Sequence, residues 1–502
     1  MQLALAAGLP ADRVTDDLVE RRLYSRDLAP VPPILTRPFF KVVPDAVVRP
    51  GGAEQVADVM RRAAEQHIPV TPRAAASTSF YNTVPVRGGL VLDVNDLRGV
   101  VDLDAARHTV RVLPATTWWE LDDALRMKGF AVKSYPSSAV SATVGGWVST
   151  QGHGIGSLAY GALGDQLISL RVVLPGGEQL VVSRDTDPPI DWFVAAEGTL
   201  GVVTEVELTV RPQPAVESHH LFAFDDPGSI GMSILSLARS EPRPFTLLFA
   251  DAGYLRLLAL AGFSVPVDLP GDPMGASGLP SSAGPSPDHV GDGGPAGPSV
   301  LLVSFQGEAD EVRRGEDALT RLAGRELPSE VALEEWNARL YHLRAKRSGP
   351  SLLAAEQWLP LERLSGYIMA VARLGARHRL LIGSYGLAVT PKLATVMTIY
   401  PADERRTVEY LAAIGFTKRL YDLGARYGGR PYGVGLWNSA YLPRLFSKGR
   451  LTELRRRKAR LDPRGIMNPG KLYRSPFPLW QPVFRPGAEL LAAVYLLRQG
   501  RR

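Results

Sequence analysis

TPRAAASTSF, residues 71–80, directly follows the apolar run IPV and consists mostly of small side chains. Side chains of this size let backbone N–H groups surround an anion, as they do in phosphate-binding loops. The segment SATVGGWVSTQGHG, residues 141–154, holds a glycine pair that lets the main chain approach a flat ligand closely. A third segment, AAEGTLGVVTEVEL at residues 195–208, turns between two glycines into a strand. Together the three segments predict one ligand site built from separated loops.

The sequence around these loops alternates between helix and strand patterns from residue 47 to residue 212. Apolar residues with helical spacing predict a helix over residues 53–66. Thr117 is placed to cap a second helix, which ends before Gly129. The predicted strands are 88–94, 108–114 and 201–210, and residues 167–182 form a predicted hairpin that turns at Pro175, Gly176 and Gly177.

Beyond Pro214 the composition changes. Residues 265–299 are dense in Gly, Pro and Ser, so we expect a disordered insertion there. It lies between two predicted strands, LLFA and LLVSF. Helices are predicted around 310–322, 330–345 and 404–427, with a strand at 395–400, which together indicate a second domain of the α+β class.

Composition excludes several classes of protein. The 502 residues carry a net charge of only +6, so no nucleic-acid partner is needed to explain the basic character, while a small anionic substrate is compatible with it. The chain has no cysteine, which excludes disulfides, thiolate catalysis and iron–sulfur clusters held by this chain. Any such centre has to belong to a partner subunit.

The two ends of the chain bear on its location. No basic residue precedes the apolar run at the N-terminus, which argues against a secretory signal and favours the cytoplasm. The uncharged apolar run Leu490–Leu497 is far shorter than the roughly 20 residues that span a bilayer. Followed by Arg498, Arg501 and Arg502, it is compatible with an amphipathic element that contacts the inner face of a membrane, or a partner subunit, peripherally. A helix packed on its own domain is the favoured alternative.

Several blocks of the sequence, in this order, resemble the vanillyl-alcohol oxidase/p-cresol methylhydroxylase (PCMH-type) flavoprotein superfamily, within it the glycolate oxidase and D-lactate dehydrogenase branch. The resemblance implies an α+β fold in which a PCMH-type FAD-binding domain of two subdomains is joined to a ferredoxin-like substrate (cap) domain, and the C-terminal part returns to the FAD domain. The blocks are PRAAASTS (72–79), TVGGWVSTQGHG (143–154), YGALGDQLISLRVVLPGGE (160–178), EGTLGVVT (197–204) and LDPRGIMNPGK (461–471).

The resemblance also implies domain boundaries. We expect an N-terminal helical extension over 1–40, the FAD-binding domain over 41–213 and the cap over 214–430. Residues 431–480 would complete the FAD domain, and 481–502 would form a tail.

The same resemblance implies which residues hold FAD. Non-covalent attachment is expected, because the loop lacks the histidine that covalent members carry and the chain has no cysteine. Alanines stand where the family has glycines in the pyrophosphate loop, and each Cβ would crowd the phosphates or oppose a positive φ angle. The implied FAD contacts are Arg73, Ala74, Ala75, Ala76, Ser77, Thr78, Ser79, Pro136, Ser137, Ser141, Thr143, Val144, Gly145, Gly146, Ser149, Thr150, Gly201, Val202, Val203 and Asn468, with hydroxyls supplied by Thr143, Ser149 and Thr150.

The substrate side departs from the metal-dependent members of the family. Their H-x-G-D-G-N-x-H and E-H-G-I-G blocks correspond here to IGSYGLAVTPKLATVMTIYP and RPYGVG, so the metal-binding residues are missing and no metal site is expected. Tyr385, Tyr400 and Tyr432 are the replacement candidates for proton transfer or hydrogen bonding, with pKa values lowered by the neighbouring Arg430. Because EEWNARLYHLRAKR resembles the family's W-x-x-R element, Arg339, Arg344 and Lys346 are the candidates for pairing a substrate carboxylate.

The predicted function is an FAD-dependent oxidoreductase that transfers a hydride from a small 2-hydroxy acid or related alcohol to the flavin N5. An external electron acceptor or an iron–sulfur partner subunit would reoxidise the flavin. Two alternatives stay open. One is a flavin-poor structural subunit of a hydroxyacid dehydrogenase complex, and the other is a redox-neutral enzyme similar to alkylglycerone-phosphate synthases.

Overall fold

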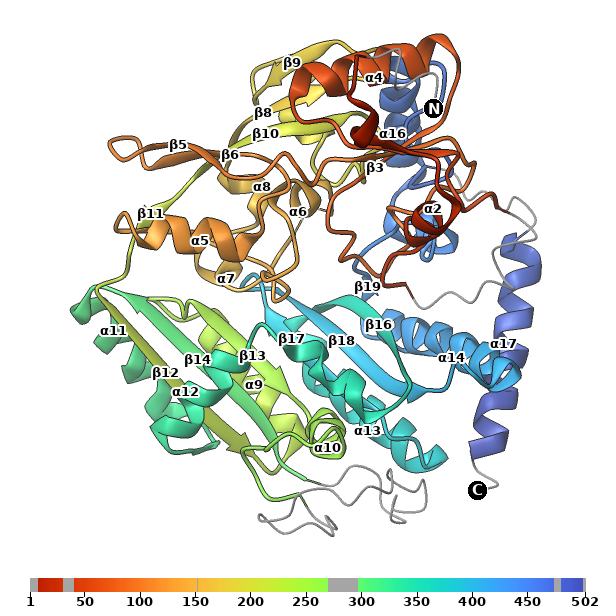
Figure 1. Ribbon diagram of the computed structural model, residues 1–502. Coiled ribbons are helices and arrows are strands. Elements are labelled where there is room, and N and C mark those ends of the chain that lie inside the picture. The colour runs from red at the N-terminus through yellow and green to blue at the C-terminus, as the bar shows by residue number, and fades with distance from the viewer. Residues whose placement is uncertain (1–7, 30–39, 151, 270–296, 474–479, 500–502) are drawn as a thin grey trace. The chain divides into compact units, whose positions relative to one another are not determined.

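The computed structural model describes residues 8–29, 40–150, 152–269, 297–473 and 480–499. The chain divides into two compact units. Unit 1 contains residues 1–153, 162–213 and 433–478, and unit 2 contains 154–161, 214–432 and 479–502. Both units combine helices and sheets, as the ribbon in Figure 1 shows. The core of the predicted insertion, residues 270–296, lies outside the described residues.

Unit 1 begins with a four-stranded sheet in the order β1-β2-β4-β3. Strands β2, β4 and β3 run parallel, and the short β1 pairs antiparallel with β2. Helix α4 packs its apolar stripe, which includes Val56, Val59 and Met60, into the core of this sheet. The elements are η1 (Ala11–Arg13), β1 (Val14–Thr15), α2 (Leu18–Leu23), β2 (Ala46–Val48), α4 (Ala53–Glu65), β3 (Val70–Arg73) and β4 (Leu90–Asp93).

A five-stranded antiparallel sheet, in the order β5-β6-β10-β8-β9, follows in unit 1. The predicted hairpin is confirmed as β8 and β9, with Gly177 at φ +89° in its turn. Thr117 caps helix α5 in a capping box with Glu120, also as expected. The elements are β5 (Val100–Asp104), β6 (Thr109–Val112), α5 (Trp118–Arg126), β7 (Phe130–Ala131), α6 (Val144–Thr150), α8 (Leu163–Gln166), β8 (Leu167–Val173), β9 (Gln179–Val182), η2 (Ile190–Trp192), β10 (Val202–Thr209), β11 (Arg211–Pro212), η7 (Ser439–Tyr441), α15 (Leu442–Leu445) and α16 (Lys448–Leu461).

Unit 2 is built on an eight-stranded sheet in the order β15-β12-β14-β13-β17-β18-β16-β19. All its pairings are antiparallel. Its elements are α7 (Ser157–Tyr160), β12 (Val216–Phe224), α9 (Pro227–Ala238), β13 (Thr246–Ala250), α10 (Ala252–Leu260), β14 (Ser299–Gly307), α11 (Ala309–Glu316), η4 (Asp317–Arg321), β15 (Arg325–Glu326), α12 (Ser329–Ala338), η5 (His342–Ser348), β16 (Ser351–Pro360), η6 (Leu361–Arg363), α13 (Leu364–His378), β17 (Gly383–Ala388), β18 (Leu393–Ala402), α14 (Thr407–Arg426), β19 (Arg430–Pro431) and α17 (Trp480–Gln499).

The structure differs from the prediction at the N-terminal end of the chain and agrees with the favoured alternative at the C-terminal end. The N-terminal extension is not purely helical, because β1 is a strand that joins the first sheet. The C-terminal apolar run lies within α17, which packs along α14 of unit 2 and places the Tyr495 ring against that of Phe416; Leu496 is also buried. This packing favours a helix docked on its own domain. None of the described helices is long and apolar enough to cross a bilayer.

Candidate functional site

The loop that follows β3 offers unused hydrogen-bond donors. Among the described residues, the backbone N–H groups of Ala74–Ser79 donate to no acceptor of the chain. Ala76 sits at φ +51°, so the backbone changes hand within the loop. Successive N–H groups around such a residue form a concave anion site. The loop therefore has the chemistry that a diphosphate needs.

The alanines of this loop are accommodated in different ways. The methyl group of Ala74 packs against the apolar core under the first sheet, and Ala76 is buried, whereas Ala75 is exposed. Of the three alanines, only Ala76 adopts the left-handed conformation. This conformation costs an L-residue roughly 1–2 kcal/mol, a cost that glycine, without a Cβ, avoids. The expected conflict with a positive φ angle is thus limited to one position. At Ala74 the Cβ serves the core.

Asn468 joins three segments that are far apart in the sequence. Its side-chain N–H₂ group donates to the carbonyl of Asn82, at 3.0 Å, and to that of Glu197, at 2.8 Å. The Glu197 N–H donates in turn to the carbonyl of Ser149 at the end of α6. Asn468 and Glu197 both have positive φ angles and are buried, so tertiary contacts hold them in place. The loop blocks predicted from the sequence therefore converge in unit 1.

Buried charges surround this junction. The Glu197 carboxylate accepts the N–H of Gly435 at 3.0 Å, and burial raises its pKa to about 7. Burial lowers the pKa of Lys471 to about 7, and its Nζ donates to the carbonyl of Val84 at 2.6 Å. Burial raises the pKa of Asp27 to about 6, against the opposing charge of Lys471. These groups tie the loop region to the C-terminal segment of unit 1.

The second small-residue segment, residues 141–154, makes most of its hydrogen bonds and close contacts within the chain. The hydroxyls of Ser149 and Thr150 donate to carbonyls within α6, and the Thr143 hydroxyl accepts the N–H of Gly146. A Cβ on Gly145 would collide with Pro114, and one on Gly201 would collide with Val172. These glycines permit close packing of the chain. Of the remaining predicted FAD contacts, Pro136, Val144 and Val202 are buried, Ser137 and Val203 are half-buried, and Ser141 and Gly146 are exposed.

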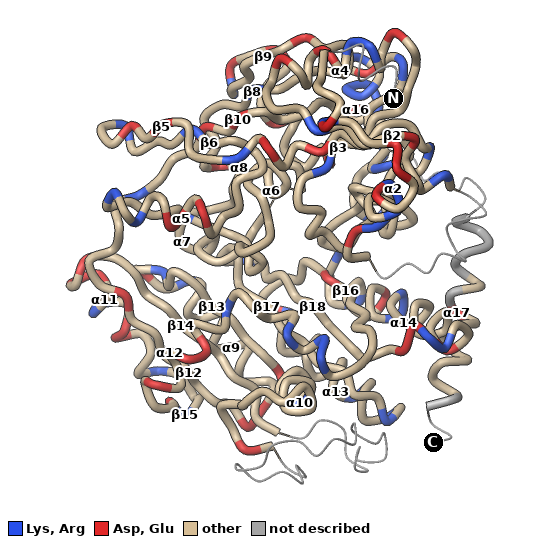
Figure 2. Tube along the Cα trace, viewed as in Figure 1, with Lys and Arg blue, Asp and Glu red and all other residues tan. Residues whose placement is uncertain are grey.

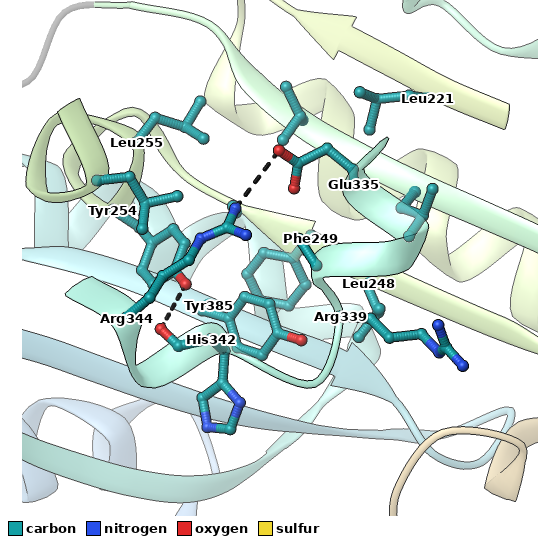
Figure 3. A pocket seen from close by; sticks show the side chains of 15 residues that line it. Leu221, Leu248, Phe249, Tyr254, Leu255, Glu335, Arg339, His342, Arg344 and Tyr385 are labelled. Carbon is teal, nitrogen blue, oxygen red and sulfur yellow. Dashed lines mark hydrogen bonds and ion pairs between the residues drawn. The ribbon is translucent and has the colours of Figure 1, made fainter. Parts of the chain in front are cut away.

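Unit 2 contains a pocket on one face of its sheet (Figure 3). Leu221, Leu302 and Leu248 are in register on neighbouring strands, so they share this face. Helices α10, α12 and η5 supply the opposite wall. The cavity measures about 40 Å³, against the roughly 10–15 Å³ that one water needs. Its lining is Leu221, Leu248, Phe249, Ala250, Tyr254, Leu255, Leu258, Val300, Leu302, Glu335, Ala338, Arg339, His342, Arg344 and Tyr385.

The polar groups of this pocket include atoms without partners. Arg344 faces Glu335, with 3.5 Å between Nη2 and Oε1 (Figure 3). Within the described part of the chain, the Arg344 Nε, the His342 Nδ1 and the Tyr385 Oη have no hydrogen-bond partner. The His342 and Tyr385 rings stack at 5.2 Å. Buried polar atoms are normally paired, so these three atoms are free to form hydrogen bonds with a polar ligand.

Burial determines the protonation states in the pocket. It lowers the pKa of His342 to about 4, so its imidazole is neutral at physiological pH. It raises the pKa of Glu335, although the positive charge of Arg344 opposes that shift. It also raises the pKa values of Tyr385 and Tyr400 above their ordinary range. The predicted lowering of tyrosine pKa values by Arg430 is therefore wrong for these two residues, because desolvation disfavours the phenolate.

The structure brings together some of the predicted substrate residues and not others. Arg339, Arg344 and Tyr385 line the pocket, but Arg339 extends away from the Arg344–Glu335 pair and stacks on Trp336 (Figure 3). Lys346 is exposed.

The other two predicted tyrosines lie away from the pocket lining. Tyr400 is buried under α14, where its hydroxyl donates to the carbonyl of Ala413 at 2.7 Å. Tyr432 stacks on Trp358 near the β19 edge of the sheet.

Sequence reasoning missed Glu335, His342 and Tyr254. A usable signal was present, since Glu335, Arg339 and His342 recur at the spacing of one helical face within the EEWNARLYHLRAKR segment. Tyr254 donates to the carbonyl of His342 at 2.7 Å and so fixes the backbone there. Nothing local distinguished Tyr254 from an ordinary core tyrosine. Among the described residues, no group of three or more His, Cys, Asp or Glu side chains is placed to hold a metal ion.

Comparison with known families agrees with this geometry. The family "FAD binding domain" matches residues 44–183. The family "FAD linked oxidases, C-terminal domain" matches residues 213–472, and this second match alone covers more than half of the chain. The chain belongs to the FAD-linked oxidases. Its cofactor is FAD, and the resemblance to PCMH-type flavoproteins is confirmed.

Relatives and solved structures of this FAD-linked oxidase span nearly its full length. The glycolate oxidase subunit GlcD of Bacillus subtilis is 25% identical and covers 91% of this chain and 93% of its own. The mitochondrial D-lactate dehydrogenase [cytochrome] of Arabidopsis thaliana is also 25% identical, over 92% of this chain and 78% of its own. p-Cresol methylhydroxylase with substrate bound has a TM-score of 0.74 at 17% identity, over 94% of this chain and 95% of its own, which confirms the predicted fold class.

The unused amides of Ala74–Ser79, the handedness change at Ala76 and the unpaired Oδ1 of the buried Asn468 fit a bound dinucleotide diphosphate. The loop would hold the diphosphate, and Asn468 would present a polar atom to the rest of the cofactor. FAD supplies a two-electron acceptor at its ring.

Proposed function

We propose that this FAD-linked oxidase oxidises a small 2-hydroxy acid, or a related small alcohol with an anionic group, at the carbon that bears the hydroxyl. The single observation that carries the proposal is the unit 2 pocket, where Arg344 Nε has no partner in the described part of the chain and lies beside apolar walls. An arginine fork binds a carboxylate through parallel Nε and Nη contacts. In this chain Glu335 engages only the Nη2 side of that fork, at a long 3.5 Å.

Each polar group of the pocket has a role in the proposal. Arg344 binds the substrate carboxylate. The Tyr385 Oη donates a hydrogen bond to the substrate hydroxyl oxygen, because its raised pKa keeps it protonated. The neutral His342 Nδ1 accepts the hydroxyl proton as the C–H bond breaks. Leu248 and Leu302 contact the carbon chain and exclude water.

The size of the cavity supports a small substrate. A volume of about 40 Å³ corresponds to only about three waters at roughly 10–15 Å³ each. The redox-neutral alternative acts on a long acyl chain, which needs a longer apolar channel. The likeness to alkyldihydroxyacetonephosphate synthase, with a TM-score of 0.71 at 19% identity over 93% of this chain and 85% of its own, shows a shared fold.

We also propose an external electron acceptor, because the chain has no cysteine to hold an iron–sulfur relay. That one relative is named as a subunit supports a partner protein in this role. A cytoplasmic location, with the C-terminal helix at most in peripheral membrane contact, belongs to the same proposal.

Anaerobic reduction of the bound flavin tests the function. We expect small 2-hydroxy acids to bleach the visible flavin bands, whereas the matching acids without the hydroxyl bind but do not bleach. Purified protein that stays colourless when FAD is added would favour the structural-subunit alternative. Stable colour with every hydroxy acid, but release of a carboxylate after addition of a long-chain alcohol to an acyl ester of a ketone phosphate, would favour the redox-neutral alternative.

A further inference from the structure

A segment near the N-terminus lies against the diphosphate loop. We call residues Asp17–Ala29 the strap; it lies outside both family matches, which begin at residues 44 and 213. Helix α2 forms its first part, and Asp17 caps that helix by accepting the N–H of Glu20 at 2.9 Å. Figure 1 shows α2, in dark red, in the same unit as β3, the strand that leads into the loop.

Two hydrogen bonds join the strap to opposite ends of the loop. Near the C-terminal end of the loop, the Leu28 N–H donates to the Thr78 carbonyl at 3.0 Å. Just before its N-terminal end, Nη1 of Arg73 donates to the Arg26 carbonyl at 2.6 Å. The Arg73 guanidinium also lies over the Tyr24 ring, 5.1 Å from its centre. The loop is therefore held from outside at Arg73, the residue that precedes it, and at Thr78, its penultimate residue.

The strap is itself fixed to the first sheet of unit 1. The Tyr24 hydroxyl donates to Oδ2 of Asp93 at 2.5 Å, and Arg21 Nε donates to the carbonyl of Pro44 at 2.6 Å. Arg49, next to β2, pairs with Glu20. These contacts fix the strap to the first sheet, so the loop residues that bond to the strap are fixed relative to that sheet as well.

The contacts orient the donors of the loop. In a trans peptide the C=O and the following N–H point in opposite directions. Because the Thr78 carbonyl points to Leu28, the Ser79 N–H points away from the strap. The Arg73 carbonyl likewise accepts the N–H of Val94, which turns the Ala74 N–H to the opposite side. The orientations of the two peptide planes at the ends of the loop, 73–74 and 78–79, are thus fixed before any anion binds.

We propose that the strap positions the Ala74–Ser79 loop for the diphosphate of FAD, with Arg73 and the Leu28 backbone as positioning groups. A loop held in its binding geometry loses less conformational freedom when the ligand binds, and affinity rises accordingly. The half-buried Arg73 also places a positive charge next to the loop that would hold the diphosphate. The inference depends on FAD binding, which the family establishes, and is independent of the substrate proposed above.

Replacement of one donor tests the proposal. Leu28→Pro removes the N–H that bonds Thr78, whereas Leu28→Ala keeps it, and the side chain is 58% exposed, so its truncation alone costs little. We expect Leu28→Pro to raise the Kd of the apoprotein for FAD about fivefold to tenfold relative to Leu28→Ala, and to raise the Kd for ADP, a diphosphate probe, by the same factor. This factor corresponds to the loss of one backbone hydrogen bond. Loss of this hydrogen bond also lowers the melting temperature of the Leu28→Pro apoprotein, so the two Kd values are compared at a temperature where circular dichroism shows both variants folded. Equal Kd values in the two variants would overturn the proposal.

If Leu28→Pro does not fold, Arg73→Gln carries the same test, with the exposed strap residue Arg22→Gln as its control.

A second measurement needs no variant. Coupling between two sites is reciprocal, so bound FAD has to stabilise the strap. We expect amide hydrogen exchange of residues 17–29 to slow at least severalfold when FAD is added to the apoprotein. Slowing confined to residues 74–79, with the strap unchanged, would contradict the proposal.

Discussion

At the scale of single residues, Arg344 is the group on which the proposed substrate binding depends. Its Nε is buried and unpaired among the described residues, and its Nη2 lies 3.5 Å from Glu335. An internal carboxylate at this distance offsets part of the buried charge while leaving donors for a ligand. The pocket therefore combines apolar walls with a positive charge whose Nε donor is unused among the described residues.

The first prediction concerns this arginine. Arg344→Gln should raise the KM for the hydroxy acid about 10- to 100-fold, since a charge-assisted bidentate contact contributes roughly 1.5–3 kcal/mol. Steady-state kinetics with Arg347→Gln, an exposed neighbour on η5, provides the control. An unchanged KM in Arg344→Gln would remove the arginine from substrate binding.

A second prediction at this scale concerns the pH dependence of stability. Burial raises the pKa of Glu197 to about 7 in the folded protein from its ordinary value of 4.5. A raised carboxyl pKa contributes stability below the unfolded pKa and loses it as pH rises through the folded one. The free energy of unfolding of wild type relative to Glu197→Gln should therefore fall between about pH 4.5 and pH 7, by up to roughly 3 kcal/mol. Parallel denaturation curves of the two proteins across this range would refute the assignment.

At the scale of elements, α17 and α14 show how a C-terminal helix becomes part of unit 2. Tyr495 of α17 lies 5.5 Å from the Phe416 ring of α14 and 6.3 Å from that of Tyr400 of β18. Lys418 of α14 pairs with Glu489 of α17 at 3.4 Å. The helix thus covers an apolar face of its own unit, while Leu490 and Leu497 face outward.

The third prediction measures that contact. Tyr495→Ala should lower the free energy of unfolding by about 3 kcal/mol, because it leaves a cavity between two packed helices. Leu490→Ala, at a position that is 67% exposed, should change it by less than about 0.5 kcal/mol. Calorimetry of both variants provides the comparison. Equal melting temperatures would mean that α17 is not docked on α14 in solution.

At the scale of the whole molecule, the two units divide the chemistry. Unit 1 carries the loop and the junction at Asn468, and unit 2 carries the pocket with Arg344. Acidic and basic residues are interspersed along the described chain of both units, as Figure 2 shows. This mixture agrees with the small net charge of +6. The proposed binding of an anionic substrate therefore rests on Arg344 in the pocket and not on a charged surface.

The fourth prediction follows from the ligand types available. The segments that correspond to the metal-binding blocks of the metal-dependent members lack the metal-binding residues, and no group of three or more His, Cys, Asp or Glu side chains gathers among the described residues, so we expect flavin reduction without a metal. The rate of anaerobic bleaching should be the same before and after dialysis against EDTA. A loss of rate that zinc or manganese restores would show a metal site that the sequence and the described structure do not reveal.

Features that depend on neighbouring residues could be predicted from the sequence. The Thr117 capping box, the turn at Gly177 and the small-residue loop at Ala74–Ser79 are set by local backbone preferences, and each appears where expected. The family resemblance supplied FAD and the fold class. The strand β1 within the N-terminal extension was not predictable, because so short a strand exists only through its pairing with β2.

The sequence alone determined that this is an FAD-binding chain with small-residue loops, no thiols and a cap rich in candidate arginines and tyrosines. Only the tertiary structure decided which of these side chains meet. Tyr385 and Arg344 are 41 residues apart yet line one pocket, whereas Tyr400 is bonded to α14 and Lys346 is exposed. The physical reason is that burial and unpaired polar atoms arise from packing between distant segments, which no local pattern encodes.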